Sequence, residues 1–131
     1  MSTRQFFSVV LYFFLNFINS AIADWTLISD GYLGSVYLDS KTIRQSNNLI
    51  TAWQLQDFLK PDKNGVKSRR LLVEINCLKE TRRIIYLSSY SEQMAKGKVI
   101  FVSSYSGKWE QPFPKSLGDR VMSSICSIYS K

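Results

Sequence analysis

The segments "RLLVEINC" (residues 70–77) and "RRIIYLSSY" (82–90) decide the fold predicted for this chain. Every second position of the first segment is apolar or a cysteine, namely Leu71, Val73, Ile75 and Cys77. A period of two is typical of a β-strand with one buried face. A short connection that includes "LKE" (78–80) separates the two segments. They are therefore predicted to form an antiparallel hairpin.

Four further strands are predicted around this hairpin, over residues 25–29, 35–39, 49–58 and 99–104. In "LITAWQLQDF" (49–58) the alternating residues are Leu49, Thr51, Trp53 and Leu55. This alternation predicts that the four face the core, with Trp53 as a core residue. The segment "KPDKNG" (60–65) is predicted to be a loop, because its proline ends a strand and Asn-Gly turns the chain.

A C-terminal helix is predicted over about residues 116–129. Ser116 followed three residues later by Asp119 is typical of a capped helix start. Apolar residues then recur at helical spacing, at Leu117, Val121, Ile125 and Ile128. Together these elements predict an α+β fold, in which one helix covers one face of an antiparallel sheet of five to six strands.

The N-terminal segment has the features of a secretory signal peptide. Arg4 precedes the apolar run "FFSVVLYFFLNFI" (6–18), and Ala21 and Ala23 form an A-x-A site. The run is shorter than the roughly 20 residues that a membrane-spanning helix needs. The prediction is cleavage between Ala23 and Asp24, which gives a signal peptide over 1–23 and a single domain over 24–131. The alternatives are an uncleaved anchor and a buried helix.

Cys77 and Cys126 are the two cysteines of the chain. They are too few for a structural zinc site and do not form a C-x-x-C motif. In the oxidising compartment that a signal peptide implies, a disulfide is the expected state. Two buried free thiols are the alternative.

No catalytic constellation is predicted. The chain contains no histidine, which excludes Ser-His-Asp and Cys-His nucleophile pairs and zinc sites that contain histidine. A glycosidase-type site needs two carboxylates on one face of a cleft. No spacing pairs any two of the candidate carboxylates in this way; these candidates are Asp39, Asp57, Asp62, Glu74 and Glu80. The segment "KGKVIFVSS" (96–104) matches an RNA-recognition motif only at its first two residues, so no nucleic-acid binding is expected. No metal or cofactor is predicted.

The charge of the chain favours anionic partners. The formal net charge is +7, and loss of Arg4 with the signal peptide leaves +6. Such partners include phosphate backbones, acidic lipids and sulfated polysaccharides, although the charge also serves ordinary solubility. Because arginine and tryptophan anchor many binding surfaces, the candidate ligand contacts are Arg69, Arg70, Arg82, Arg83 and Trp109.

Ordered segments across the domain resemble one known family. They begin with Trp25, "VYLDSKTI" (36–43), "ITAWQLQDF" (50–58), Pro61 and Ser68. They continue with "VEINC" (73–77), "RRIIYLSSYSEQM" (82–94), Gly97, Val99, "KWE" (108–110), "PKSLG" (114–118) and "IC" (125–126). In this pattern the chain resembles the surface-adhesin protein E-like domains, small exported proteins of Gram-negative bacteria.

The resemblance implies an antiparallel sheet with a C-terminal helix, and a disulfide between Cys77 and Cys126. The family is named after a lipid-anchored adhesin that binds host matrix and serum proteins. Lipid anchoring requires a cysteine at the first mature position, where this chain has Asp24, so neither a lipid anchor nor a transmembrane anchor is expected after cleavage.

These features lead us to expect a non-enzymatic binding module of the cell envelope. Its ligand is expected to be a host matrix protein or an acidic polysaccharide. The alternative is a structural or accessory periplasmic protein that acts through a homodimer or a larger assembly. The expected location is the periplasm, with the cell surface or the medium as alternatives.

Overall fold

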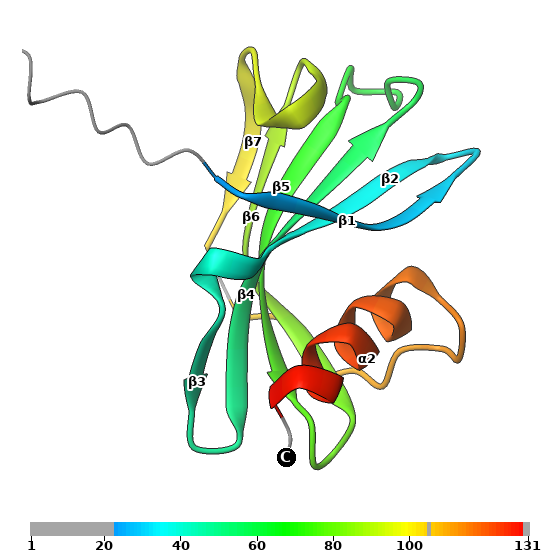
Figure 1. Ribbon diagram of the computed structural model, residues 1–131. Helices are drawn as coiled ribbons and strands as arrows, with labels where there is room; N and C mark the ends of the chain where they lie inside the picture. The colour runs from blue at the N-terminus through cyan, green and yellow to red at the C-terminus, as the bar shows by residue number, and fades with distance from the viewer. Residues whose placement is uncertain (1–22, 105, 130–131) are drawn as a thin grey trace, which may run out of the picture.

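The computed structural model describes residues 23–104 and 106–129, which form an antiparallel sheet and one long helix (Figure 1). The strands are β1 (Trp25–Gly31), β2 (Gly34–Asp39), β3 (Arg44–Ser46), β4 (Leu49–Phe58), β5 (Ser68–Asn76), β6 (Thr81–Tyr90) and β7 (Val99–Ser103). The helices are α2 (Leu117–Tyr129) and the short 3-10 turns η1 (Ser40–Thr42) and η2 (Gln93–Ala95). The predicted α+β class is confirmed. The signal-peptide prediction for 1–23 falls almost entirely outside the described residues.

The sheet has the order β1-β2-β4-β5-β6-β7, and β3 pairs with β4 beside β2. Its centre is the predicted hairpin, in which β5 and β6 pair from Ser68–Tyr90 to Asn76–Thr81. A bulge at Leu72/Val73 interrupts this register and leaves Ile85 without an opposite residue. The long strand β4 pairs with β3 near its start and with β2 near its end.

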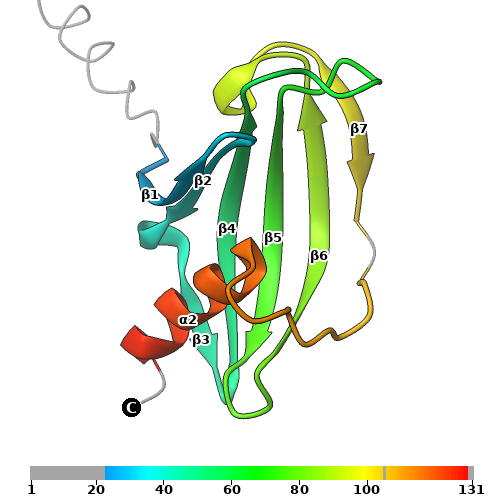
Figure 2. The ribbon, with the colours of Figure 1, turned by 90° about the vertical axis from the view of Figure 1, so that its right-hand side faces the viewer.

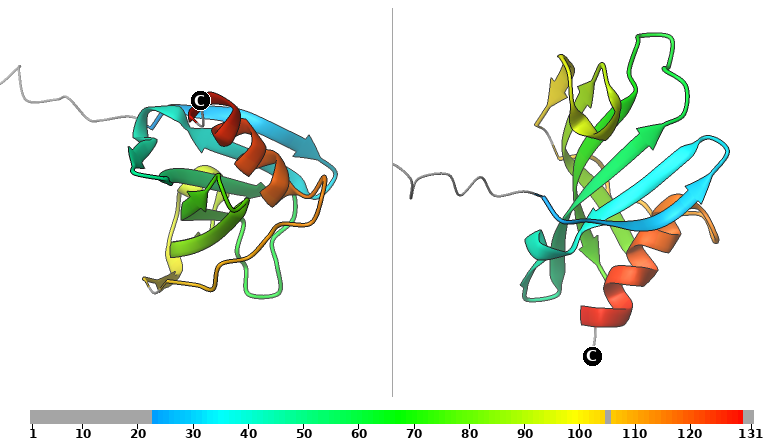
Figure 3. Two further views of the ribbon diagram at one scale, coloured as in Figure 1. Left: turned by 90° about the horizontal axis from the view of Figure 1, so that it is seen from below. Right: turned by 45° about the horizontal axis from the view of Figure 1, so that its top comes forward.

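The helix α2 covers the core on one side of the sheet, in front of β4 and β5 in Figure 2. Ser116 caps its start, since the Ser116 hydroxyl accepts a hydrogen bond from the Asp119 amide at 3.2 Å. Val121, Met122 and Ile125 are buried, whereas the predicted stripe residues Leu117 and Ile128 are 46% and 63% exposed. From below, α2 lies beside β1 and β2, and the chain from β7 runs round to reach it (Figure 3).

The predicted orientation of β4 is wrong, although Leu55 of the predicted set is fully buried. Its residues that face α2 and join the core are Ile50 and Ala52. Trp53 points to the opposite side of the sheet and is only half-buried. Both alternating sets of this strand contain apolar residues, so the burial of one set depends on which side α2 covers.

Cys77 and Cys126 form a disulfide, as expected from the compartment and from the resemblance. Cys77 follows the last residue of β5, and Cys126 lies in the last turns of α2. The bond therefore fastens the helix to the lower end of the sheet, where the 47–48 and 77–80 turns lie (Figure 1). The upper end carries the connections 59–67 and 91–98.

Candidate ligand-binding surfaces

The four candidate arginines lie on both sides of the sheet, because neighbouring residues of a strand point in opposite directions. In β6 Arg82 pairs with Ile75, a core residue, so its side chain is on the α2 side. Arg83 pairs with Glu74 and lies on the opposite, open side. In β5 Arg69 is on the α2 side and Arg70 on the open side. The candidate contacts therefore do not form one patch.

On the open side, Arg70 takes part in an aromatic stack. Its guanidinium carbon lies 3.9 Å from the centroid of the Trp53 ring. Trp53 in turn meets Tyr86 edge to face, with the ring centroids 5.5 Å apart. Cation–π and edge-to-face contacts both hold such side chains in fixed positions. The half-buried Trp53 thus contacts both Arg70 and Tyr86 on this side of the sheet.

Arg83 is also held by neighbouring residues. Its Nε donates a hydrogen bond of 2.8 Å to Glu74 Oε1, and its guanidinium carbon lies 4.6 Å from the Trp109 ring centroid. The side chains of Arg83 and Glu74 are only 27% and 15% exposed. Arg83 can contact Trp109 because a β-bridge between Glu110 and Arg82 holds the 107–110 segment along β6. These contacts fasten that segment to the sheet.

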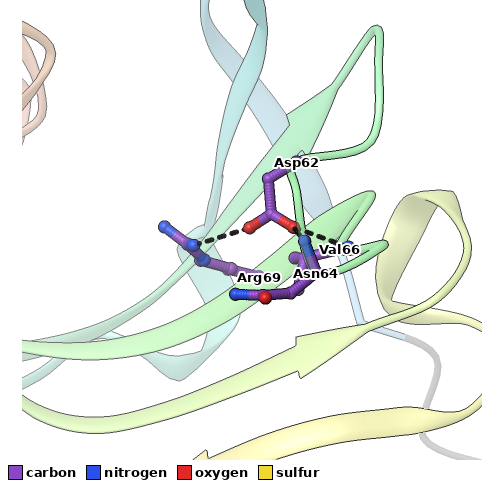
Figure 4. Close-up of polar contacts among 4 residues, drawn as sticks. All are labelled: Asp62, Asn64, Val66 and Arg69. Atoms are coloured by element: carbon purple, nitrogen blue, oxygen red, sulfur yellow. Dashed lines mark hydrogen bonds and ion pairs between the residues drawn. The ribbon is translucent and has the colours of Figure 1, made fainter.

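Arg69 is tied to the loop that precedes it (Figure 4). Its Nη2 lies 3.2 Å from Asp62 Oδ2, and its guanidinium carbon lies 5.4 Å from the Phe58 ring centroid. Asp62 Oδ1 accepts hydrogen bonds from the amides of Val66 and Asn64, at 3.0 and 2.8 Å. The bond from Val66, together with that from Asn64 and the positive charge of Arg69, lowers the pKa of Asp62 in spite of some desolvation.

Arg82 has a different environment. It lines a groove between β6 and the 107–116 segment and is half-buried there. Within residues 23–104 and 106–129, its guanidinium makes no hydrogen bond and no ion pair. Burial lowers the pKa of Arg82, while the nearby charge of Glu110 raises it.

The upper end of the sheet gathers five exposed lysines, which we call the basic end. They come from the 59–67 and 91–98 connections and are Lys60, Lys63, Lys67, Lys96 and Lys98. Two acids, Asp62 and Glu92, lie in the same connections. Among the described residues, none of these lysines forms an ion pair. These lysines were not among the predicted ligand contacts, although an antiparallel meander places both connections at the same end.

Both connections of the basic end are fixed to the sheet. The Met94 amide donates to Asp57 Oδ1 at 2.9 Å, and the Ala95 amide donates to Ser68 Oγ at 2.9 Å. The Lys67 amide donates to the Tyr90 carbonyl at 2.9 Å. The backbone at Lys67 and at residues 94–95 is therefore held in place before a ligand binds, which lowers the entropy cost of binding.

Two further properties concern the described part of the chain. No helix in it has the length and the hydropathy needed to cross a membrane. The same residues contain no group of three or more aspartate, glutamate, cysteine or histidine side chains that could hold a metal ion.

Comparison with known proteins identifies the family. The model of the family described as surface-adhesin protein E matches residues 25–127. A search of the curated proteins gave no match. Crystal form II of Haemophilus influenzae protein E is similar in structure, with a TM-score of 0.63 and 15% identity, over 86% of this chain and 94% of that chain.

Two other structures are also similar. The selenomethionine form of Haemophilus influenzae protein E has a TM-score of 0.63 and 16% identity, over 86% of this chain and 92% of that chain. Protein E from non-typeable Haemophilus influenzae has a TM-score of 0.54 and 14% identity, over 84% of this chain and 81% of that chain. At such identities the structural likeness concerns the fold, and the family match covers nearly the whole described domain. The chain therefore belongs to the surface-adhesin protein E family.

Proposed function

We propose that this chain is a non-enzymatic binding module of the cell envelope that attaches to an acidic polysaccharide or to host matrix proteins. Membership of a surface-adhesin family supports an adhesin-like role. The observation that carries the proposal is the basic end, where five exposed lysines lack ion-pair partners among the described residues. Unpaired exposed cations attract a polyanion and lose little internal stabilisation when they bind it.

Of the candidate arginines, Arg69 and Arg70 adjoin the basic end, because they follow Ser68 at the start of β5. We propose them as secondary contacts, reached once the lysines have engaged the ligand. Arg83 and Trp109 lie farther along the sheet and contact one another. Their proposed part is to shape the surface beside β6 for a protein ligand.

The module is proposed to be exported and to reside in the periplasm or at the cell surface. The proposed cleavage lies between Ala23 and Asp24, and the first mature residue is then not a lipid-accepting cysteine. N-terminal sequencing of the mature protein tests the cleavage, and a start at Met1 would contradict it. Protease digestion of intact cells tests exposure, since cleavage only after rupture of the outer membrane would reject a surface location.

Heparin chromatography tests the binding proposal. Lys63→Glu/Lys96→Glu changes the net charge by −4 at the basic end, and Lys79→Glu/Lys115→Glu makes the same change elsewhere. We expect the first variant to lose about 10- to 30-fold in affinity, since each of four unit charge changes is worth roughly 0.5 kcal/mol. The second variant should elute close to wild type. Equal losses in both variants would mean that net charge alone, and no particular surface, governs retention.

A second candidate function is self-association through the edge strand β7. Val99, Phe101 and Val102 are 56%, 57% and 50% exposed, on a strand whose outer edge carries no partner strand among the described residues. Exposed apolar edges pair readily with other strands. Light scattering on wild type and on Phe101→Lys tests it, because an edge-paired dimer should dissociate in that variant. A monomeric wild type would reject this candidate.

A further inference from the structure

A groove of about 660 Å³ runs along β6, between β7, the 107–116 segment and the start of α2. Its apolar walls include Ile84, Leu87, Phe101, Pro112 and Phe113. Phe101 and Phe113 are 57% and 84% exposed, so both rings contribute apolar surface that the fold itself leaves uncovered. A volume of this size falls within the range of small-molecule sites, about 300–1,000 Å³.

Four charged residues line this groove, namely Arg82, Arg83, Lys108 and Glu110, and the candidate anion-binding group among them is Arg82. It projects from the core side of β6, as its pairing with the buried Ile75 indicates. Its guanidinium has no hydrogen-bond or ion-pair partner within residues 23–104 and 106–129. Glu110 lies near Arg82 but forms no ion pair with it. A partly dehydrated cation without a direct hydrogen-bond partner is unfavourable, and an anion that binds it would reduce that cost. Arg69 and Arg83 differ, since each already holds a carboxylate.

Gly118, in the first turn of α2, provides the space that the Arg82 guanidinium occupies. A Cβ atom added at Gly118 would overlap Nη1 of Arg82, and it would lie 3.4 Å from Cβ of Pro112. The Arg82 guanidinium can therefore occupy this position only because residue 118 of α2 has no side chain. Alanine at this position would displace the guanidinium without removing it.

We propose that this groove binds an amphiphile that carries one carboxylate on an apolar body. The carboxylate accepts hydrogen bonds from the planar guanidinium of Arg82, whose donors match both of its oxygens. The apolar body lies against Phe101, Phe113 and Leu87. A highly charged polymer fits these apolar walls poorly and suits the basic end instead. The groove is thus a site distinct from the basic end.

Calorimetric titration with decanoate tests the proposal, and decan-1-ol serves as the uncharged match. We expect wild type to bind decanoate more tightly than the alcohol. Arg82→Gln should weaken decanoate binding about 10- to 100-fold, the usual range for a hydrogen bond to a charged group. It should leave binding of the alcohol unchanged. Arg120→Gln is the matched control, because Arg120 is exposed and its Nη1 donates to the Ser29 hydroxyl on β1.

Gly118→Ala provides a second variant that retains the arginine. Alanine favours a helix over glycine, and the displaced atom is the end of a flexible side chain, so the melting temperature should not fall. Decanoate binding should nevertheless weaken. No binding of decanoate to wild type, equal binding of acid and alcohol, or unchanged binding in both variants would overturn the proposal.

The Lys63→Glu/Lys96→Glu variant separates this site from the basic end. If the groove is the site, this variant binds decanoate like wild type, and the amide resonances that shift are those of Ile84, Ser103 and Phe113. Shifts confined to residues 59–67 and 91–98 would overturn the assignment to the groove, whatever the result for heparin.

Discussion

The lower end of the sheet is covered by α2 and fastened by the Cys77–Cys126 disulfide, whereas the upper end presents five exposed lysines. The 77–80 turn at the lower end contains one lysine and one glutamate. The residues that stabilise the fold and those proposed to bind an anion thus lie apart. Changes at one end should alter stability, and changes at the other end should alter binding. The following predictions test that separation.

Removal of the disulfide should have the largest effect. Cys77→Ala/Cys126→Ala frees a loop with a sequence separation of 49 residues. We expect the free energy of unfolding to fall by about 4 kcal/mol, measured by urea denaturation. Under conditions where the variant is folded, its elution from heparin should match that of wild type. A shifted elution would show that the two ends are coupled, and a stability loss below about 1 kcal/mol would contradict the structural role.

Arg83→Ala should have the next largest effect on stability. It leaves Glu74 half-buried without its ion-pair partner, which costs about 2 kcal/mol. Arg70→Ala is the comparison, because Arg70 contacts Trp53 through a cation–π interaction worth about 0.5–1 kcal/mol. Urea denaturation of both variants measures which of them loses more free energy of unfolding. An Arg83 variant as stable as wild type would mean that its contact with Glu74 contributes no net stability.

The smallest predicted effect concerns Asp62 and the loop at the basic end. Hydrogen bonds from Val66 and Asn64 and the charge of Arg69 lower the pKa of Asp62 below its ordinary value of 3.8. A carboxyl group whose pKa is lower in the folded state stabilises the fold above its unfolded pKa. That contribution is lost as the pH falls below 3.8 and through the folded pKa.

The amide resonance of Val66 reports this titration. We expect its chemical shift to change with a midpoint below 3.8, and to lose that step in Asp62→Asn. A midpoint at or above 3.8 in wild type would contradict the loop geometry.

Local patterns in the sequence predicted the main elements of the fold. The alternation in 70–77 and the short connection to 82–90 correspond to β5 and β6, and the spacing from Ser116 onward corresponds to α2. The orientation of β4 was not predictable in this way. Trp53 has the size of a core residue, but the buried face carries Ile50 and Ala52, because α2 packs on that side. Contact with a distant helix decides which alternating set joins the core cluster, although Leu55 of the other set is also fully buried.

The candidate surfaces were predicted only in part. The predicted arginine contacts are neighbours in sequence, yet alternation along the strands separates Arg69 from Arg70 and Arg82 from Arg83. The lysines of 59–67 and 96–98 are far apart in sequence and meet because antiparallel strands return both connections to one end. The groove depends on the path of the 107–116 segment. Its Pro112 and Pro114 exclude regular pairing, so no periodicity indicates where it runs.

The dependence of heparin affinity on salt concentration tests the central claim most directly. Each cation that engages a polyanion contributes roughly one unit to the slope of log affinity against log salt. If the basic end binds the anion, Lys63→Glu/Lys96→Glu should lower this slope by about 2 units. The charge-matched Lys79→Glu/Lys115→Glu should keep the wild-type slope. Equal slopes for wild type and both variants would contradict the claim that the basic end binds the anion.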